Sequence, residues 1–109
     1  MKGNTDRLLE MKAEIIQAVA HPIRLAVVEL LTEGEMCVCD IAEQVGTERS
    51  NCSRHLSVML RAGVLDVRKE GLKMIYSLKT PCIKNFLSCV ENVLRSRISE
   101  NIGLMEEIG

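Results

Sequence analysis

The chain has 109 residues, and its 14 Lys and Arg against 15 Asp and Glu give a formal net charge of −1. A hydrophobic fraction of 47% with 27% charged residues is that of an ordinary globular domain, which excludes a disordered tail, a collagen-like chain and a large multidomain enzyme. We expect one domain over residues 1–109. No apolar run is long enough to span a membrane, and the first residues lack an apolar signal core, so we expect a cytoplasmic protein with no membrane partner.

The charge is unevenly distributed along the chain. Residues 1–46 contain 4 basic and 8 acidic side chains, whereas residues 47–79 contain 7 basic and 3 acidic ones. A near-neutral total therefore conceals a basic middle third, and a local basic surface can bind a phosphate backbone even on a neutral protein. A solvated charged surface would have the same counts, so charge alone does not decide between the two.

Helical periodicity predicts two helices in the first third of the chain. Thr5 and Asp6 can cap the first, whose apolar positions recur at helical spacing until His21. Pro22 ends that helix and occupies the first position of the second, which we expect to run to Thr32.

Two further helices and a hairpin follow. The pattern predicts a short helix over 38–45 that Gly46 ends, and a longer one from Thr47, its cap, to Arg61. Alternating apolar residues over 64–69 and 72–78 then predict a two-stranded hairpin with its turn at Glu70-Gly71. Thr80-Pro81 opens a last helix, which we expect to extend to about Arg97, with one more helical turn allowed in the tail.

Two helices joined by a tight turn and followed by a basic hairpin are typical of a winged helix-turn-helix. We therefore expect a mainly α fold with a small β-hairpin. The second helix of the motif and the hairpin carry side chains suited to phosphates and base edges. The predicted DNA-binding residues are Arg49, Ser50, Asn51, Ser53, Arg54, His55, Arg68, Lys69 and Lys73.

Several segments together resemble the ArsR/SmtB family of metal-sensing repressors, in the order and at the spacing typical of that family. They are 20–25 (AHPIRL), 35–42 (EMCVCDIA), 53–56 (SRHL), 62–65 (AGVL), 68–71 (RKEG) and 76–78 (YSL). The resemblance implies a homodimeric winged-helix repressor, paired through its first and last helices, that leaves its double-stranded DNA operator when an inducer binds.

The sequence departs from the subgroups of that family at the positions that would name the inducer. Ala42 stands where the arsenic-responsive pattern has a third cysteine, and residues 1–36 lack the cysteines of the cadmium- and lead-responsive branch. Neither His21 nor His55 lies on the last helix, where the zinc-responsive branch has ligands. The zinc site is therefore not expected.

Cys37-Val38-Cys39 is the strongest chemical signal in the chain. Five cysteines without a secretion signal favour soft-metal ligands or redox sensors over a disulfide framework. Two thiols two residues apart can chelate one ion where the backbone departs from a regular helix, and thiolates prefer arsenic(III)-like species, Cd or Pb. A monoalkyl arsenic(III) needs two thiols and arsenite three. The candidates for the third are Cys52, Cys82 and Cys89.

The other cysteines and histidines have simpler interpretations. Cys52 is expected in the core, and Cys82 and Cys89, seven residues apart on the last helix, at a dimer interface. His55 is expected to reach a phosphate, and His21 to help the chain enter its helix.

Two alternatives to metal sensing remain open. A thiol-based redox or persulfide sensor would have the same fold, and a winged-helix module could bind protein instead of DNA. No acid–base pair, phosphate loop or nucleophile–base set indicates an enzyme.

Overall fold

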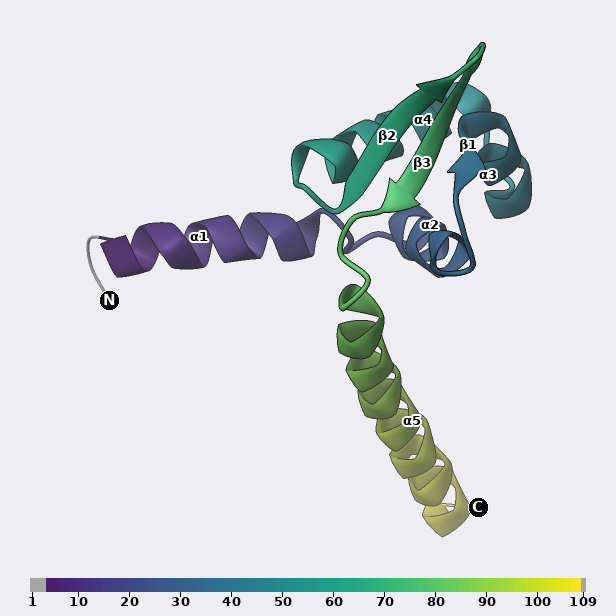
Figure 1. Ribbon diagram of the computed structural model, residues 1–109. Coiled ribbons are helices and arrows are strands. Elements are labelled where there is room, and N and C mark those ends of the chain that lie inside the picture. Colours follow the sequence, from purple (N-terminus) through teal and green to yellow (C-terminus); the bar gives the residue numbers. More distant parts are fainter. Residues whose placement is uncertain (1–3, 109) are drawn as a thin grey trace.

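The structure, a computed structural model, describes the backbone of residues 4–108 and the side chains of residues 6–102. Its elements follow in the order α1 (Asn4–Gln17), α2 (Pro22–Thr32), β1 (Met36–Cys37), α3 (Val38–Val45), α4 (Arg49–Arg61), β2 (Leu65–Glu70), β3 (Lys73–Leu78) and α5 (Ile83–Ile108). Helices α2, α3 and α4 pack with the sheet into one body, from which α1 and α5 project (Figure 1). This confirms the predicted mainly α class with a small antiparallel hairpin.

Several helix ends follow local signals and others do not. Helix α1 already includes Asn4, so Thr5 and Asp6 lie inside it and do not cap it, and it ends at Gln17, four residues before His21. Helix α5 begins at Ile83, after Thr80-Pro81. Gly46 adopts the left-handed conformation (φ 79°) that ends α3, and its N–H bonds Ala42 O at 2.9 Å. The N-cap of α4 is Glu48 and not Thr47, and Thr47 Oγ1 accepts a hydrogen bond from Asn51 Nδ2 at 2.9 Å. Helix α5 runs past the predicted end near Arg97 to Ile108.

The sheet has three strands, in the order β1-β3-β2, where the sequence predicted two. The hairpin of β2 and β3 turns at Gly71 and Leu72, one residue later than expected, with Gly71 at φ 63°. The additional strand, Met36–Cys37, pairs antiparallel with β3. It ties the segment before α3 to the hairpin of β2 and β3 (residues 65–78), which is the wing.

The hydrophobic core lies between α2, α3, α4 and the start of β2. Cys52 is fully buried in it, which confirms the expected core position. The largest fully buried side chains are those of Val27, Val28, Ile41, Cys52, Leu56, Met59, Val64 and Leu65. Their burial fixes α4 against the body and turns its opposite side to solvent.

Apolar side chains follow one side of each projecting helix and are left exposed. On α1, Leu8 and Ile16 are 56% and 50% exposed, and on α5, Phe86 and Val93 are 47% and 60% exposed. Such stripes on a single chain are typical of helices that pack against a partner. Within the part of the chain that the structure describes, no single helix is long and apolar enough to cross a membrane. Only α1 and α2 taken together pass that test, as a pair bent by 78°.

Candidate functional site

The N-terminal half of α4 presents the predicted DNA-binding side chains. Its buried face is formed by Cys52, Leu56 and Met59, which points the intervening positions outward. Among those positions Arg49, Ser50 and Arg54 are exposed, and Asn51, Ser53 and His55 are half-buried.

Two hydrogen bonds order the exposed polar groups at the start of α4. Asn51 Nδ2 donates to Thr47 Oγ1, and Asn51 Oδ1 accepts from Arg54 Nη2 at 3.3 Å. Asn51 thus links the α3–α4 turn to the guanidinium of Arg54, which stays open to solvent. An ordered, exposed cation on this helix can meet a phosphate without a large loss of side-chain entropy.

His55 lies against α2. Its Nδ1 accepts a hydrogen bond from Arg24 Nε at 3.0 Å, and its ring lies 4.4 Å from that of His21, centroid to centroid. Partial burial first, and then the nearby charges of His21, Arg24 and Arg54, lower the pKa of His55. The neutral ring that accepts at Nδ1 carries its proton on Nε2, and only that nitrogen is left to donate to a phosphate.

His21 has the role expected of it. Its Nδ1 accepts from the backbone N–H of Ile23 at 3.1 Å, so it caps the helix that Pro22 begins.

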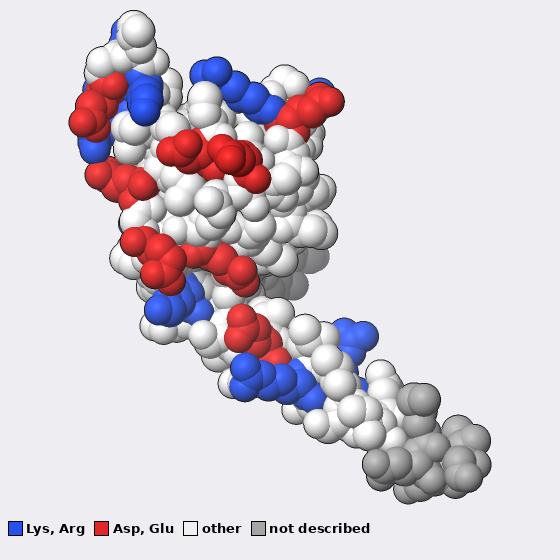
Figure 2. Space-filling model, turned by 90° about the vertical axis from the view of Figure 1, so that its right-hand side faces the viewer, with Lys and Arg blue, Asp and Glu red and all other residues white. Residues whose placement is uncertain are grey.

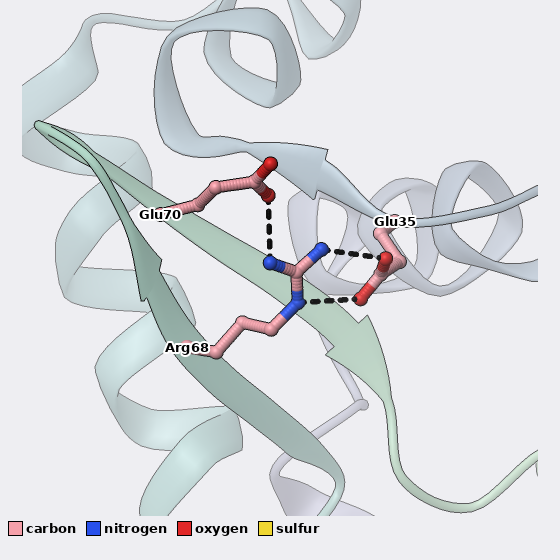
Figure 3. A network of polar contacts seen from close by, with 3 residues as sticks. All are labelled: Glu35, Arg68 and Glu70. Carbon is pink, nitrogen blue, oxygen red and sulfur yellow. Dashed lines mark hydrogen bonds and ion pairs between the residues drawn. The ribbon is translucent and has the colours of Figure 1, made fainter.

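The wing carries the three predicted cations in two different settings. Lys69 and Lys73 are exposed near the tip of the hairpin and, within the described residues, form no ion pair. Arg68 instead makes ion pairs with Glu35 at 2.9 Å and Glu70 at 2.6 Å (Figure 3). The free charge of the wing is therefore concentrated on the two lysines.

The two cysteines of the Cys-x-Cys segment lie in different environments. Cys37 ends β1 in an extended conformation (φ −80°, ψ 159°) and is buried at 7% exposure, whereas Cys39 lies in the first turn of α3 and is exposed. The segment is thus a strand-to-helix junction, not a regular helix. Among the described residues, no group of three or more His, Cys, Asp or Glu side chains is placed to hold a metal ion.

The remaining three thiols lie on or next to other helices, Cys52 on α4 and Cys82 and Cys89 at α5. Burial raises the pKa of Cys52, which keeps it a protonated core thiol. Cys82 precedes α5 instead of lying on it, and it lines an apolar pocket of about 280 Å³ between α1 and α5, together with Val19 and Phe86. Cys89 is exposed on α5.

Acidic side chains occupy a different side of the molecule. Figure 2 shows Asp and Glu gathered across the body of the domain on the side where α3 lies in Figure 1. Asp40 and Glu43 of α3 are both exposed. This negative surface is unsuited to a phosphate backbone, which leaves the start of α4 and the wing tip as the candidate DNA interface.

The sequence did not indicate the contacts of Glu35 with Arg68 and of Arg24 with His55, two predicted DNA-binding residues. Each partner lies more than 30 residues away along the chain, at separations of 33 and 31 residues. No local spacing could have indicated either contact.

Comparison with known proteins identifies the family. A sequence model described as "Bacterial regulatory protein, arsR family" matches residues 21–67. The HTH-type transcriptional regulator Rv0081 of Mycobacterium tuberculosis is 36% identical over 105 residues, which cover 95% of this chain and 92% of that protein. The chain belongs to the ArsR family. This ArsR-family regulator is also 32% identical to the "Cadmium resistance transcriptional regulatory protein CadC homolog" of Staphylococcus aureus, over 69% of the chain and 63% of that protein.

Solved structures agree with this assignment. The crystal structure of Rv0081 superposes on the ArsR-family regulator with a TM-score of 0.76 and 38% identity, covering 87% of this chain and 96% of that one. A homodimeric winged helix-turn-helix DNA-binding domain, Mb0332 of Mycobacterium bovis, has a TM-score of 0.78 at 24% identity, with 92% and 93% covered. The fold is that of a winged helix-turn-helix transcriptional regulator.

Proposed function

We propose that this protein is a homodimeric repressor that binds a DNA operator and leaves it when a thiophilic metal or metalloid binds at Cys37 and Cys39. The observation that carries the proposal is the position of these thiols. They flank the start of α3, and α3 packs against α4, the helix that bears the exposed polar residues.

On DNA, α4 would lie in the major groove. Arg49, Ser50, Asn51, Ser53, Arg54 and His55 supply the donor and acceptor types that read base edges and bind phosphates. Lys69 and Lys73 would bring the wing tip to the backbone or the minor groove. Because the wing packs beside α4, both contacts can form together (Figure 1).

The dimer would form through α1 and α5. Both helices leave an apolar side exposed, and the apolar pocket between Ile16, Cys82 and Phe86 can receive side chains of a second copy. A two-fold dimer requires a two-fold operator, with half-sites about one helical turn, roughly 10 bp, or a multiple of it apart.

The inducer would act by uncovering Cys37. Cys39 is accessible, but Cys37 is buried in a strand paired with Ile75, so a ligand that takes both sulfurs must loosen β1 or the first turn of α3. Soft thiolates select arsenic(III), Cd or Pb, and the relative named as a cadmium resistance regulator supports a metal inducer in general. The ligand must favour the non-binding conformation, which is the thermodynamic condition for release.

The test uses the chain and duplex DNA from its own promoter region. We expect salt-dependent binding, and release of the DNA under anaerobic conditions by arsenite, a monoalkyl arsenic(III) species, Cd²⁺ or Pb²⁺, but not by the hard cation Mg²⁺. Release by an oxidant alone would replace metal sensing by redox sensing. No salt-dependent DNA binding at all would favour a protein-interaction module.

A further inference from the structure

One row of side chains crosses the sheet from Cys37 on β1 to Arg68 on β2. Ile75 on β3 is paired with Cys37 of β1 on one side and with Arg68 of β2 on the other. Residues directly opposite one another in antiparallel strands share a face, so Cys37, Ile75 and Arg68 lie on the same face of the sheet. In the adjacent row Tyr76 and Met36 pack against the core, so the face with Arg68 is the one turned away from it.

On that face the Arg68 guanidinium extends over β3 to the residue preceding β1. Its Nε and Nη2 donate to the two carboxylate oxygens of Glu35 at 3.3 and 2.9 Å, and its Nη1 donates to Glu70 at 2.6 Å (Figure 3). Every nitrogen of the guanidinium thus has a carboxylate partner. One cation with two carboxylates also carries a net negative charge, which does not attract a phosphate.

The charges of the pair stabilise each other's ionised forms. The hydrogen bond from Arg68 lowers the pKa of Glu35, and the bonds to Glu35 and Glu70 raise that of Arg68. Both side chains are about half exposed, at 51% and 49%, and ion pairs of that kind add little to the stability of a fold. The bidentate arrangement instead fixes a distance and an orientation between two segments.

Those segments are the wing and the β1–α3 junction, which carries Cys37 and Cys39. Glu35 stands two residues before Cys37, and Arg68 stands on the wing strand farthest from β1. Strand β1 pairs with β3 over two residues, so the Glu35–Arg68 contact adds a second link between these segments beside a short one.

We propose that Glu35 is a positioning residue for the wing: through Arg68 it fixes the hairpin to the segment that carries Cys37, and Arg68 holds the wing instead of binding a DNA phosphate. The inference rests on the proposed DNA binding for its functional consequence. Displacement of the β1–α3 junction would then move the wing as well as α4.

The first experiment needs no DNA. Hydrogen exchange of the free protein is compared between the wild type, Glu35→Gln and the matched control Asp66→Asn, which removes an exposed carboxylate from the same strand as Arg68. We expect faster exchange in residues 66–75 for Glu35→Gln and wild-type exchange there for Asp66→Asn. Unchanged exchange of the hairpin in Glu35→Gln would overturn the proposal.

The second experiment separates a positioning role from a phosphate contact. Lys keeps the positive charge of Arg68 but lacks the planar guanidinium that donates two hydrogen bonds to one carboxylate. We therefore expect Arg68→Lys, Arg68→Gln and Glu35→Gln to weaken DNA binding by the same several-fold factor. The melting temperature and the salt dependence of binding, the slope of log affinity against log salt, should not change. The double variant Glu35→Gln/Arg68→Gln should be no weaker than either single variant. If Arg68→Lys binds like wild type, if Glu35→Gln binds more tightly, or if Arg68→Gln reduces the slope by about 1, Arg68 contacts phosphate and the proposal is wrong.

Discussion

Arg24 on α2 donates a hydrogen bond from its Nε to Nδ1 of His55 on α4, across 3.0 Å. The bond requires a neutral imidazole, because a protonated ring has no lone pair to accept with. The side chain of Arg24 is itself held by a bond from Nη1 to the backbone carbonyl of Gln17 at 3.3 Å. Arg24 therefore joins the end of α1 to the candidate recognition helix, and its bond to that helix depends on the protonation state of His55.

This arrangement predicts a pH dependence of folding stability. The pKa of His55 is lowered below the ordinary histidine value of about 6.5, so the unfolded chain takes up a proton that the native state does not. The contribution is fully present above about pH 6.5 and is lost as the pH falls from there through the lowered pKa. Urea unfolding at a fixed protein concentration, repeated at several pH values, should show this loss in wild type.

The variant His55→Gln serves as the reference for that measurement, because carboxylates also begin to titrate in acid. It should lose less unfolding free energy than wild type over the same acidic window, and the difference between the two should be constant above about pH 7. Equal losses in the two proteins would show that the Arg24–His55 bond does not carry the effect.

Local signals in the sequence account for most of the fold. Pro22 and Gly46 mark helix ends with special backbone geometry, and α2 and α3 have the predicted bounds. The exposure of Arg49 and Arg54 also follows from helical periodicity alone. That these residues contact DNA stays a prediction.

The features that sequence reasoning missed depend on contacts between distant segments. Strand β1 has two residues and no alternation of its own, and it exists because Met36 and Cys37 pair with Tyr76 and Ile75. In the fold Cys37 is buried and Cys39 is exposed, a difference that the symmetric Cys-x-Cys pattern does not contain.

Removal of the Arg54 charge should weaken DNA binding in a salt-dependent way. The guanidinium is exposed on α4 and ordered by Asn51. If Arg54→Ala loses one phosphate contact, the slope of log affinity against log salt should become shallower by about 1. A fluorescence-anisotropy titration at several salt concentrations measures both quantities.

The matched control is Arg61→Ala, since Arg61 is an exposed arginine at the other end of the same helix. It should leave both affinity and slope near the wild-type values. An equal effect of the two substitutions would indicate a general charge effect and contradict the assignment of Arg54.

A charge in the apolar stripe of α5 should dissociate the dimer. Val93 is 60% exposed in the single chain, and a carboxylate there would be buried without a partner in a helix-to-helix interface. We expect Val93→Glu to sediment as a monomer and to bind a two-fold operator far more weakly. Helical geometry places Asn92 on the opposite side of α5, so Asn92→Glu should remain a dimer. A dimeric Val93→Glu would show that α5 does not form the interface.

Substitution of the thiols should separate sensing from DNA binding. Cys37→Ser and Cys39→Ser should each retain most of the DNA binding of the ligand-free protein, because Ser is close in size and neither residue lies on α4. Each should abolish or strongly reduce release by arsenic(III) or a similar thiophile. Cys52→Ser should respond normally but unfold more easily, by on the order of 1–3 kcal/mol, because it places a hydroxyl in a fully buried position.

An operator-release titration of these variants, with urea unfolding alongside, distinguishes the two kinds of effect. A stability control is needed for Cys37→Ser in particular, since Cys37 is buried and Cys39 is exposed. Cys39→Ser therefore gives the cleaner result, and its loss of response without a loss of stability would support a ligand at the β1–α3 junction. If the Cys37→Ser/Cys39→Ser double variant still releases DNA at the wild-type inducer concentration, the sensor lies elsewhere. Cys82 and Cys89, which are exposed in the single chain, would then be the next thiols to substitute.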